Sequence, residues 1–285
     1  MPTDQEKAAL SDLLDDPSPS VRRSLLHYFQ NMGREGERLL RQIAEGSNRI
    51  KAVHARWFIT ELRFTDPVKE FRGFIRSLSY ELETGVILLC RTVHSDLNVS
   101  RFCGQLDRMA ARCRELMLDA LPIREKCRII NRVLFHEYGF RGNVEDYTDP
   151  ENSYLHRVLE TRKGLPISLS ILYLLVAERC GVRLEPVGLP GHFVVGCYRG
   201  GEVFFIDPFD RGRFLTPEDL TAYLVGRNIS PEAAPLVPTT VREVLCRSCR
   251  NLANHYAELN QPPLARLFAS FVDEFEAAYE QNTKS

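Results

Sequence analysis

A histidine and an aspartate at the two ends of a predicted β-hairpin carry the sharpest chemical signal in the sequence. The β-type run HFVVGCY begins at His192, the run VFFID ends at Asp207, and the pair Gly200-Gly201 between them is typical of a hairpin turn. A turn centred on that pair places Val194 opposite Asp207, so that His192 and Asp207 become diagonal neighbours on one face. A carboxylate bonded to one imidazole nitrogen fixes the tautomer and leaves the other nitrogen to act as a general base. We therefore predict a His192–Asp207 dyad; the alternative is a half-buried structural histidine beside a strand-ending aspartate.

A dyad of this kind usually works on a nucleophile, and the start of a helix favours one because the positive end of the helix dipole lowers the pKa of a thiol. No cysteine begins the helix predicted before the hairpin: Cys180 lies at its far end, and Cys197 has the wrong strand parity to share the face of His192. Ser168 is the hydroxyl in the first turn. It is either a candidate catalytic residue or a serine that bonds the local backbone.

The helix itself is predicted from the segment Gly164-Leu165-Pro166 and the run ISLSILYLLVAERCG that follows it. Proline suits the first helical position, and Gly181 suits the position just past the end. The run is apolar on nearly all sides, and a helix without a polar face must be buried all round. We expect this helix to pass through the middle of its domain.

The segment before that helix, GFRGNVEDYTDPENSYL, is rich in Gly, Asn, Asp and Pro, a composition typical of an irregular surface loop. Asn152, Tyr154 and Arg162 flank the entry to the buried helix. Since irregular backbone near a buried helix must have its polar groups satisfied, we predict that these three residues line the His192 cleft or brace its loop.

Outside this region the sequence is mainly helical. Residues 1–65 form a predicted N-terminal helical piece, in which LLDDPSPSVRRSLLHYF resembles one unit of a HEAT-type repeat, although no second copy with a matching period follows. Residues 99–118 form a long amphipathic run. Thr240 and Glu243 make a capping-box pattern, and Pro262 precedes another helical run, so residues 236–285 are predicted to form a helix pair.

Composition excludes several classes of function. The 285 residues include 37 Lys and Arg against 38 Asp and Glu, and a net charge of -1 gives no general attraction for nucleic acid or anionic membranes. The longest nearly apolar stretch, residues 165–177, is too short to span a bilayer. The polar, acidic N-terminus is unlike a secretory signal, and the eight scattered cysteines indicate a reduced, cytoplasmic protein. The Cys246–Cys249 pair has no second half of a zinc site, so we expect no metal and no cofactor.

Several linked segments resemble a known family. The segments YTDPENSYLHRVLETRKGLPISLSILYLLVAERCGV, GLPGHFVVG and FIDPFDRGRFL are similar to the SirB-type branch of the transglutaminase-like superfamily, over roughly residues 67–224. The resemblance implies an α+β fold, in which a papain-like core of a central buried helix on a small antiparallel sheet is embedded in a mainly helical chain. It suggests a SirB-type domain over residues 66–235, followed at 236–285 by tetratricopeptide-like helices.

The resemblance also implies roles for individual residues. In active transglutaminase-like enzymes, a Cys at the start of the central helix attacks an amide, a His on the next strand is the base, and an Asp on the following strand orients the His. His192 and Asp207 match the last two roles, whereas the Cys position falls near Pro166. This departure predicts a non-catalytic binding or regulatory module with a protein or peptide partner. The alternative is a hydrolase of an amide or ester, with a Ser168-His192-Asp207 or water-His-Asp arrangement.

Overall fold

The chain forms two compact units. The computed structural model describes residues 4–62, 66–118, 120–199 and 203–283. Contacts group Met1–Glu70 and Arg91–Asp96 into unit 1, and Phe71–Cys90 and Leu97–Ser285 into unit 2. Each unit has a hydrophobic core of its own.

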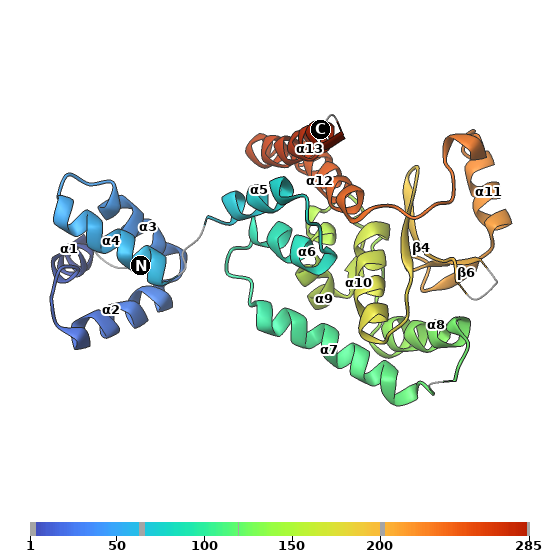
Figure 1. Cartoon of the computed structure of the whole chain (residues 1–285), viewed down its shortest axis with the longest axis horizontal. Coiled ribbons are helices and arrows are strands. Elements are labelled where there is room, and N and C mark those ends of the chain that lie inside the picture. The colour runs from blue at the N-terminus through green and yellow to red at the C-terminus, as the bar shows by residue number, and fades with distance from the viewer. Residues whose placement is uncertain (1–3, 63–65, 119, 200–202, 284–285) are drawn as a thin grey trace. The chain divides into compact units, whose positions relative to one another are not determined.

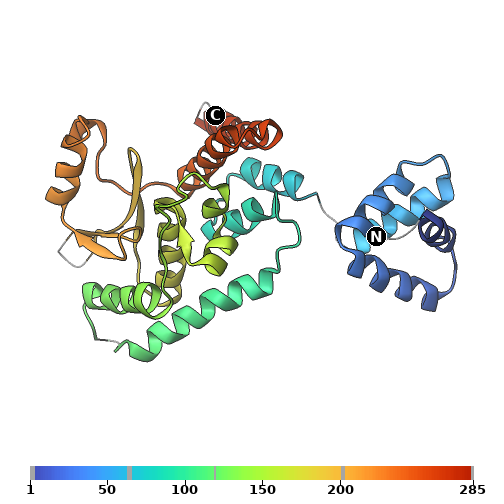
Figure 2. The same cartoon turned by 180° about the vertical axis from the view of Figure 1, so that it is seen from behind.

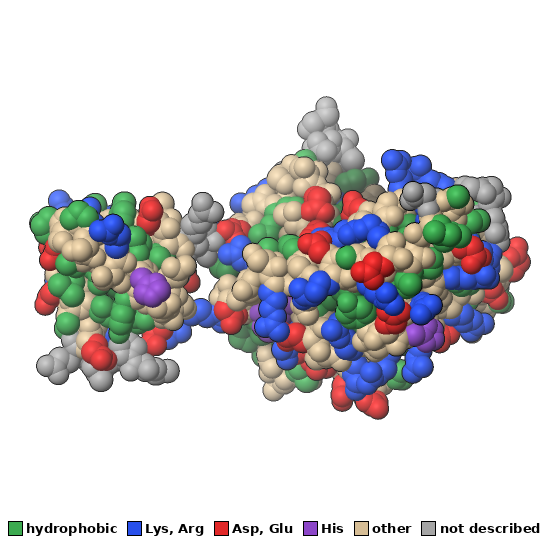
Figure 3. Space-filling model, turned by 90° about the horizontal axis from the view of Figure 1, so that it is seen from below, with side chains coloured by type: hydrophobic (Ala, Val, Ile, Leu, Met, Phe, Trp, Pro, Cys, Tyr) green, Lys and Arg blue, Asp and Glu red, His purple; other side chains and the backbone are tan. Residues whose placement is uncertain are grey.

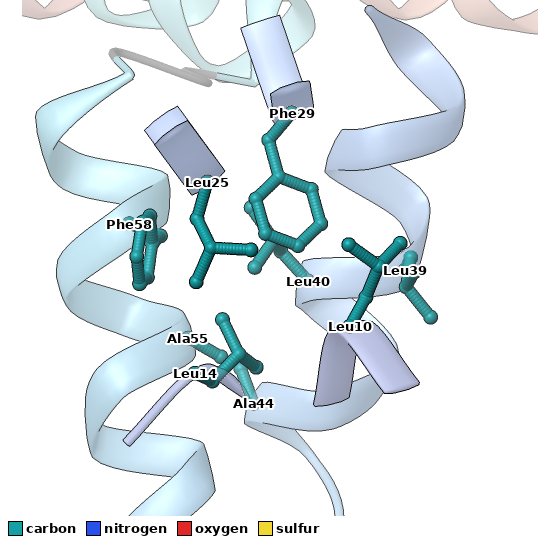
Figure 4. Packing of buried hydrophobic residues seen from close by; sticks show 9 residues of the cluster. All are labelled: Leu10, Leu14, Leu25, Phe29, Leu39, Leu40, Ala44, Ala55 and Phe58. Carbon is teal, nitrogen blue, oxygen red and sulfur yellow. The ribbon is translucent and has the colours of Figure 1, made fainter. Parts of the chain in front are cut away.

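Unit 1 is helical, as its sequence predicts. Its main elements are α1 (Asp4–Leu13), α2 (Pro19–Met32), α3 (Arg34–Ala44) and α4 (Arg49–Glu61), drawn in blue in Figure 1. Asn48 caps α4, accepting a bond from the amide of Lys51. The buried apolar side chains of all four helices meet in one cluster, shown in Figure 4: Leu10, Leu14, Leu25, Phe29, Leu39, Leu40, Ala44, Ala55 and Phe58.

Unit 2 contains the remaining helices. Before its sheet come most of α5 (Pro67–Ser77) and α6 (Leu82–Arg91), then α7 (Val99–Leu116), α8 (Ile123–Asn131), a π-helix (Arg132–Glu137), a 3₁₀ turn (Pro150–Ser153) and α9 (Leu155–Thr161). After the sheet come α11 (Pro217–Val225), a 3₁₀ turn (Pro231–Ala233), α12 (Val241–Glu258) and α13 (Pro262–Thr283). The last two pack against each other as the predicted helix pair.

The central helix of unit 2 is α10 (Pro166–Arg179). Every residue from Pro166 to Ala177 is buried, so the prediction of a helix without an exposed face is confirmed. It contacts α7, α8, α9 and α12 as well as the sheet, and Figures 1 and 2 both show it beside β4. Gly181, just past the helix end, has φ 70°, a conformation that favours glycine.

The sheet of unit 2 is small and antiparallel, with the order β3 (Glu185–Leu189), β4 (His192–Cys197), β5 (Phe204–Asp207) and β6 (Arg213–Leu215). Val195 pairs with Ile206 and Cys197 with Phe204, which is the register that the sequence predicts. The Gly200-Gly201 turn itself lies outside the described residues. A separate two-residue parallel pair joins β1 (Arg141–Gly142) to β2 (Lys163–Gly164). The α+β fold with a buried central helix on an antiparallel sheet is therefore confirmed.

In the described part of the chain, no helix is both long and apolar enough to cross a membrane.

Candidate functional site

His192 and Asp207 are joined directly. Two residues, Pro190 and Gly191, connect β3 to β4, and Gly191 has φ 71°, as a tight turn with proline before glycine requires. His192 is the first residue of β4 and Asp207 the last of β5. Nε2 of His192 lies 2.7 Å from Oδ2 of Asp207. The hairpin thus brings together the two residues that the sequence predicts as a dyad.

The Asp207 carboxylate is held from its other side by the loop that follows it. Its Oδ1 accepts bonds from the backbone amides of Phe209, at 3.0 Å, and Asp210, at 3.2 Å. The amide of Gly212 donates to the carbonyl oxygen of Asp207 at 2.8 Å. Because the carboxylate is an acceptor, Nε2 of His192 is the donor, and Nδ1 of the neutral ring is an acceptor for a ligand or a proton.

The turn that presents His192 is fixed by α12. Nη2 of Arg247 donates to the carbonyl oxygens of Leu189, at 2.6 Å, and His192, at 2.8 Å. Its guanidinium lies over the ring of Phe193, and burial lowers the pKa of Arg247. A side chain from the C-terminal helix pair therefore sets the position of the candidate base.

A cleft of about 510 Å³ opens beside the dyad. Its aromatic walls are Tyr147, Phe209 and Tyr223, and the rings of Phe209 and Tyr223 lie 6.2 and 5.7 Å from the imidazole of His192. The Tyr223 hydroxyl donates to the carbonyl oxygen of Pro190, and burial, the largest influence, raises the pKa of this tyrosine. A cleft with aromatic walls and a few polar groups is typical of a ligand-binding site.

Pro166, the first residue of α10, also lines this cleft. It occupies the place beside His192 where the resemblance expects a nucleophilic cysteine. None of the described residues that line the cleft is a cysteine, and the eight cysteines of the chain are all unbridged. Cys180 follows the far end of α10, and Cys197 ends β4 on the face opposite to His192.

Ser168 is not among the described residues that line the cleft. Its side chain is buried, and its hydroxyl donates to the carbonyl oxygen of Asn152 at 2.7 Å and accepts from the amide of Leu165 at 2.9 Å. Both bonds tie the start of α10 to the preceding loop. The hydroxyl thus makes the local backbone bonds that were the alternative to a catalytic role.

Asn152 braces the loop before α10. Its Nδ2 donates to the carbonyl oxygen of Asp146 at 2.6 Å, and its Oδ1 accepts from Nδ2 of Asn143 at 2.9 Å. Asn143 and Asn152 are both buried. Of the two roles predicted for Asn152, the structure places it in the loop brace and not in the wall of the cleft.

Tyr154 and Arg162 likewise lie away from the lining of the cleft. Tyr154 is fully buried, and its hydroxyl is 3.0 Å from that of Tyr256 on α12. Arg162 ends α9 with a left-handed φ of 62° and lies over the rings of Tyr138 and Phe140. Tyr154 thus joins the loop to α12, whereas Arg162 packs on the segment between the π-helix and β1.

Most residues of the cleft's walls were not predicted from the sequence. Tyr147 and Phe209 belong to segments that carry the resemblance, whereas Tyr223 and Arg227 come from α11 and the residues just after it. The start of α11 could have been predicted from a capping-box pattern. Thr216 is followed by a proline and then by Asp219, whose carboxylate accepts a hydrogen bond from the Thr216 amide. Nothing in the sequence indicated that α11 faces His192.

Among the described residues, no group of three or more His, Cys, Asp or Glu side chains is placed to hold a metal ion. Cys246 and Cys249 are both buried on α12, and burial raises the pKa of Cys246 to about 11. A neutral thiol is a poor metal ligand.

A buried histidine on α12, His255, makes the stability of the protein depend on pH. Burial lowers the pKa of His255, against weaker opposing effects of Glu258 and Asp149, and its Nδ1 has no bonding partner among the described residues. Below about pH 6.5 the unfolded chain therefore binds a proton at His255 more readily than the folded chain does, so this residue makes stability fall as the pH falls.

We expect the free energy of unfolding, measured in urea across about pH 8 to 5, to decline less steeply in His255→Asn than in the wild type. Equal slopes would contradict a buried neutral His255.

Comparisons with known proteins agree with this fold and place it in a family. The model of the transglutaminase-like superfamily matches residues 100–250, just over half of the chain. No solved structure matches the chain.

Among curated proteins, a UPF0162 protein of Xylella fastidiosa strain 9a5c is 33% identical over 190 residues, which are 63% of this chain and 66% of that protein. F-box only protein 21 of Mus musculus is 40% identical over 131 residues, 43% of this chain and 20% of that protein. The UPF0162 protein YchA of Escherichia coli K12 is 30% identical over 151 residues, 52% of this chain and 55% of that protein. The chain thus spans just under two thirds of the Xylella relative and less of the others. With a family model that covers more than half of its length, the chain belongs to the transglutaminase-like superfamily.

Proposed function

We propose that this domain is a non-catalytic module that binds a polypeptide segment in the cleft beside His192. The observation that carries the proposal is Pro166, which lines the cleft at the start of α10. Proline has no nucleophilic side-chain atom, so no residue at this position can attack the amide in the covalent step of a transglutaminase-like reaction. We further propose that the domain belongs to the SirB-type branch, on the strength of its quoted segments, and that it works in the cytoplasm, because all eight cysteines are free.

Neither Ser168 nor Tyr223 replaces the missing thiol. Ser168 does not line the cleft, and its buried hydroxyl is bonded to the backbone of Asn152 and Leu165. Tyr223 keeps its proton more firmly than an exposed tyrosine, since burial raises its pKa. The groups that remain, a hydrogen-bonded imidazole between aromatic rings, suit the recognition of a side chain or a peptide group.

A second candidate function is hydrolysis of an amide or ester by a water molecule that His192 activates. The 2.7 Å bond between His192 and Asp207 favours it, because an orienting carboxylate is what a general base requires. The Ser-His-Asp version of this hypothesis has less support, because the Ser168 hydroxyl is engaged elsewhere.

Restoring the thiol tests the proposal. We expect Pro166→Cys to be alkylated by iodoacetamide at residue 166 about tenfold faster or more than Ser168→Cys is at residue 168, because only the first position lines the cleft. Adding His192→Ala should remove most of this advantage. Site-resolved mass spectrometry separates these rates from those of the native cysteines.

The wild type supplies the contrary arm of the experiment. We expect no amide or ester hydrolysis above that of His192→Ala. Turnover in the wild type that His192→Ala abolishes would establish the water-His-Asp hydrolase instead. Slow alkylation of Pro166→Cys that does not depend on His192 would refute the idea that only the nucleophile is missing.

A further inference from the structure

A second cavity adjoins the His192 cleft. It has a volume of about 340 Å³, and its lining includes Arg141, Lys163 and Arg211. The two cavities share Phe209, whose ring packs so closely on Gly142 that a Cβ there would lie 2.5 Å from it. A ligand that extends past Phe209 would therefore contact both cavities.

The two carboxylates that line the His192 cleft already have hydrogen-bond partners. Asp207 bonds His192 and two backbone amides. Asp219 accepts a hydrogen bond from the amide of Thr216 at 2.7 Å. Its hydrogen bonds with the backbone and the side chain of Thr216 lower the pKa of Asp219.

The two carboxylates of the second cavity are also paired. Glu145 pairs with Lys163 at 2.8 Å, and Asp210 lies 3.7 Å from Arg213. Both carboxylates thus have a cationic neighbour within the protein, although the Asp210–Arg213 pair is exposed and weak.

Three arginines of the same cavities lack such partners. Within the described residues, no carboxylate forms an ion pair with Arg141, Arg211 or Arg227, although Arg141 adds to the stronger effect of Lys163 in lowering the pKa of Glu145. Arg227 is also held in place: its guanidinium lies 4.7 Å from the centre of the Tyr223 ring, and Nη1 would be 3.0 Å from a Cβ on Gly191. Together the described linings of the two cavities carry five Lys and Arg side chains against four Asp and Glu side chains, an excess of one positive charge. On the face seen in Figure 3, Lys and Arg side chains are likewise interspersed with Asp and Glu.

We propose that the occupant of the cleft is an acidic polypeptide segment, with one carboxylate on Arg227 beside His192 and others on Arg141 and Arg211 beyond Phe209. This inference rests on the proposed function. Guanidinium groups bind carboxylates through charge-assisted, often bidentate hydrogen bonds. Because the three arginines are spread over two cavities, a ligand with several carboxylates along one chain satisfies them better than a small anion does.

Binding of defined peptides to the full chain tests this inference. The probes are a fluorescein-labelled (Glu-Ala-Gly)₄ peptide and its (Gln-Ala-Gly)₄ counterpart, with affinity read from fluorescence anisotropy. We expect the Glu peptide to bind about tenfold tighter than the Gln peptide at low salt, and the difference to shrink as salt is added. Arg227→Gln should weaken binding of the Glu peptide about tenfold and leave the Gln peptide nearly unchanged. Arg183→Gln, an exposed arginine outside both cavities, should change neither affinity.

The outcomes separate this inference from the proposed function. Equal affinity for the two peptides, both weakened by Tyr223→Ala, would leave a peptide-binding cleft without acidic preference and overturn the inference alone. Binding of neither peptide up to millimolar concentration would also overturn it, while the alkylation of Pro166→Cys tests the missing nucleophile independently. Displacement of the Glu peptide by a short single-stranded RNA of similar affinity would assign the arginines to phosphate and likewise overturn it.

Discussion

Phe58→Ala should lower the free energy of unfolding of unit 1 by about 3 to 5 kcal/mol, which is the usual cost of emptying a fully buried phenylalanine site. Phe58 has no exposed surface and packs against Phe29, with ring centres 5.8 Å apart. As Figure 4 shows, it belongs to the one cluster that joins all four helices of the unit. A unit of this size has few other apolar contacts with which to compensate.

The single tryptophan makes the measurement specific. Trp57 is in unit 1, so tryptophan fluorescence in urea reports the unfolding of that unit, whereas far-UV circular dichroism reports the whole chain. We expect Phe58→Ala to move the fluorescence transition to lower urea and leave the main dichroism transition in place. The matched control is Phe271→Ala, a fully buried phenylalanine of unit 2, which should do the reverse. If either variant moved both transitions equally, the two units would unfold as one.

Gly212→Ala should destabilise unit 2 by about 3 kcal/mol, from a positive φ and a clash together. Gly212 has φ 77°, and a Cβ there would lie 2.4 Å from Cγ of Asn131. Asn131 is buried, and its Nδ2 donates to the carbonyl oxygen of Gly212 at 2.6 Å, so it cannot move away without losing that bond. The loop from Asp207 to Gly212 would shift as a result.

Gly139→Ala isolates the contribution of the clash. Its φ of 75° is nearly the same, but no atom lies within 4 Å of the added Cβ. We expect this control to lose only about 1 to 2 kcal/mol, the cost of the left-handed backbone. Urea unfolding followed by circular dichroism measures both variants. Equal losses at the two positions would mean that Asn131 yields freely and that the loop is not fixed by it.

The central helix and the dyad could be predicted because local patterns determine them. The apolar run from Leu165 to Ala177 has no polar face, so burial on all sides was the consistent solution. The dyad followed from strand parity, because side chains on a strand alternate with a period of two. Neither prediction depends on how distant elements pack against each other.

The remaining walls of the cleft could not be predicted, because they depend on contacts between segments far apart in the chain. Tyr147 and Tyr223 meet at His192 only once the sheet, the loop and α11 are in place. The strand β6 has three residues, too few for alternation to be recognised. The role of Ser168 could not be predicted for the same reason. The sequence is consistent with two roles, and the position of the Asn152 carbonyl oxygen determines which hydrogen bond the hydroxyl makes.

The two bonds from Arg247 to the β3–β4 turn bear on how this domain can be recombined with others. A fragment cut at residue 235, where the resemblance ends the domain, would leave the carbonyl oxygens of Leu189 and His192 without their donor. The region matched by the family model extends to residue 250 and so retains it. A fragment that keeps the position of His192 therefore has to include α12. A fragment made of the sheet and the central helix alone would contain the residues of the site but not Arg247, which positions the turn.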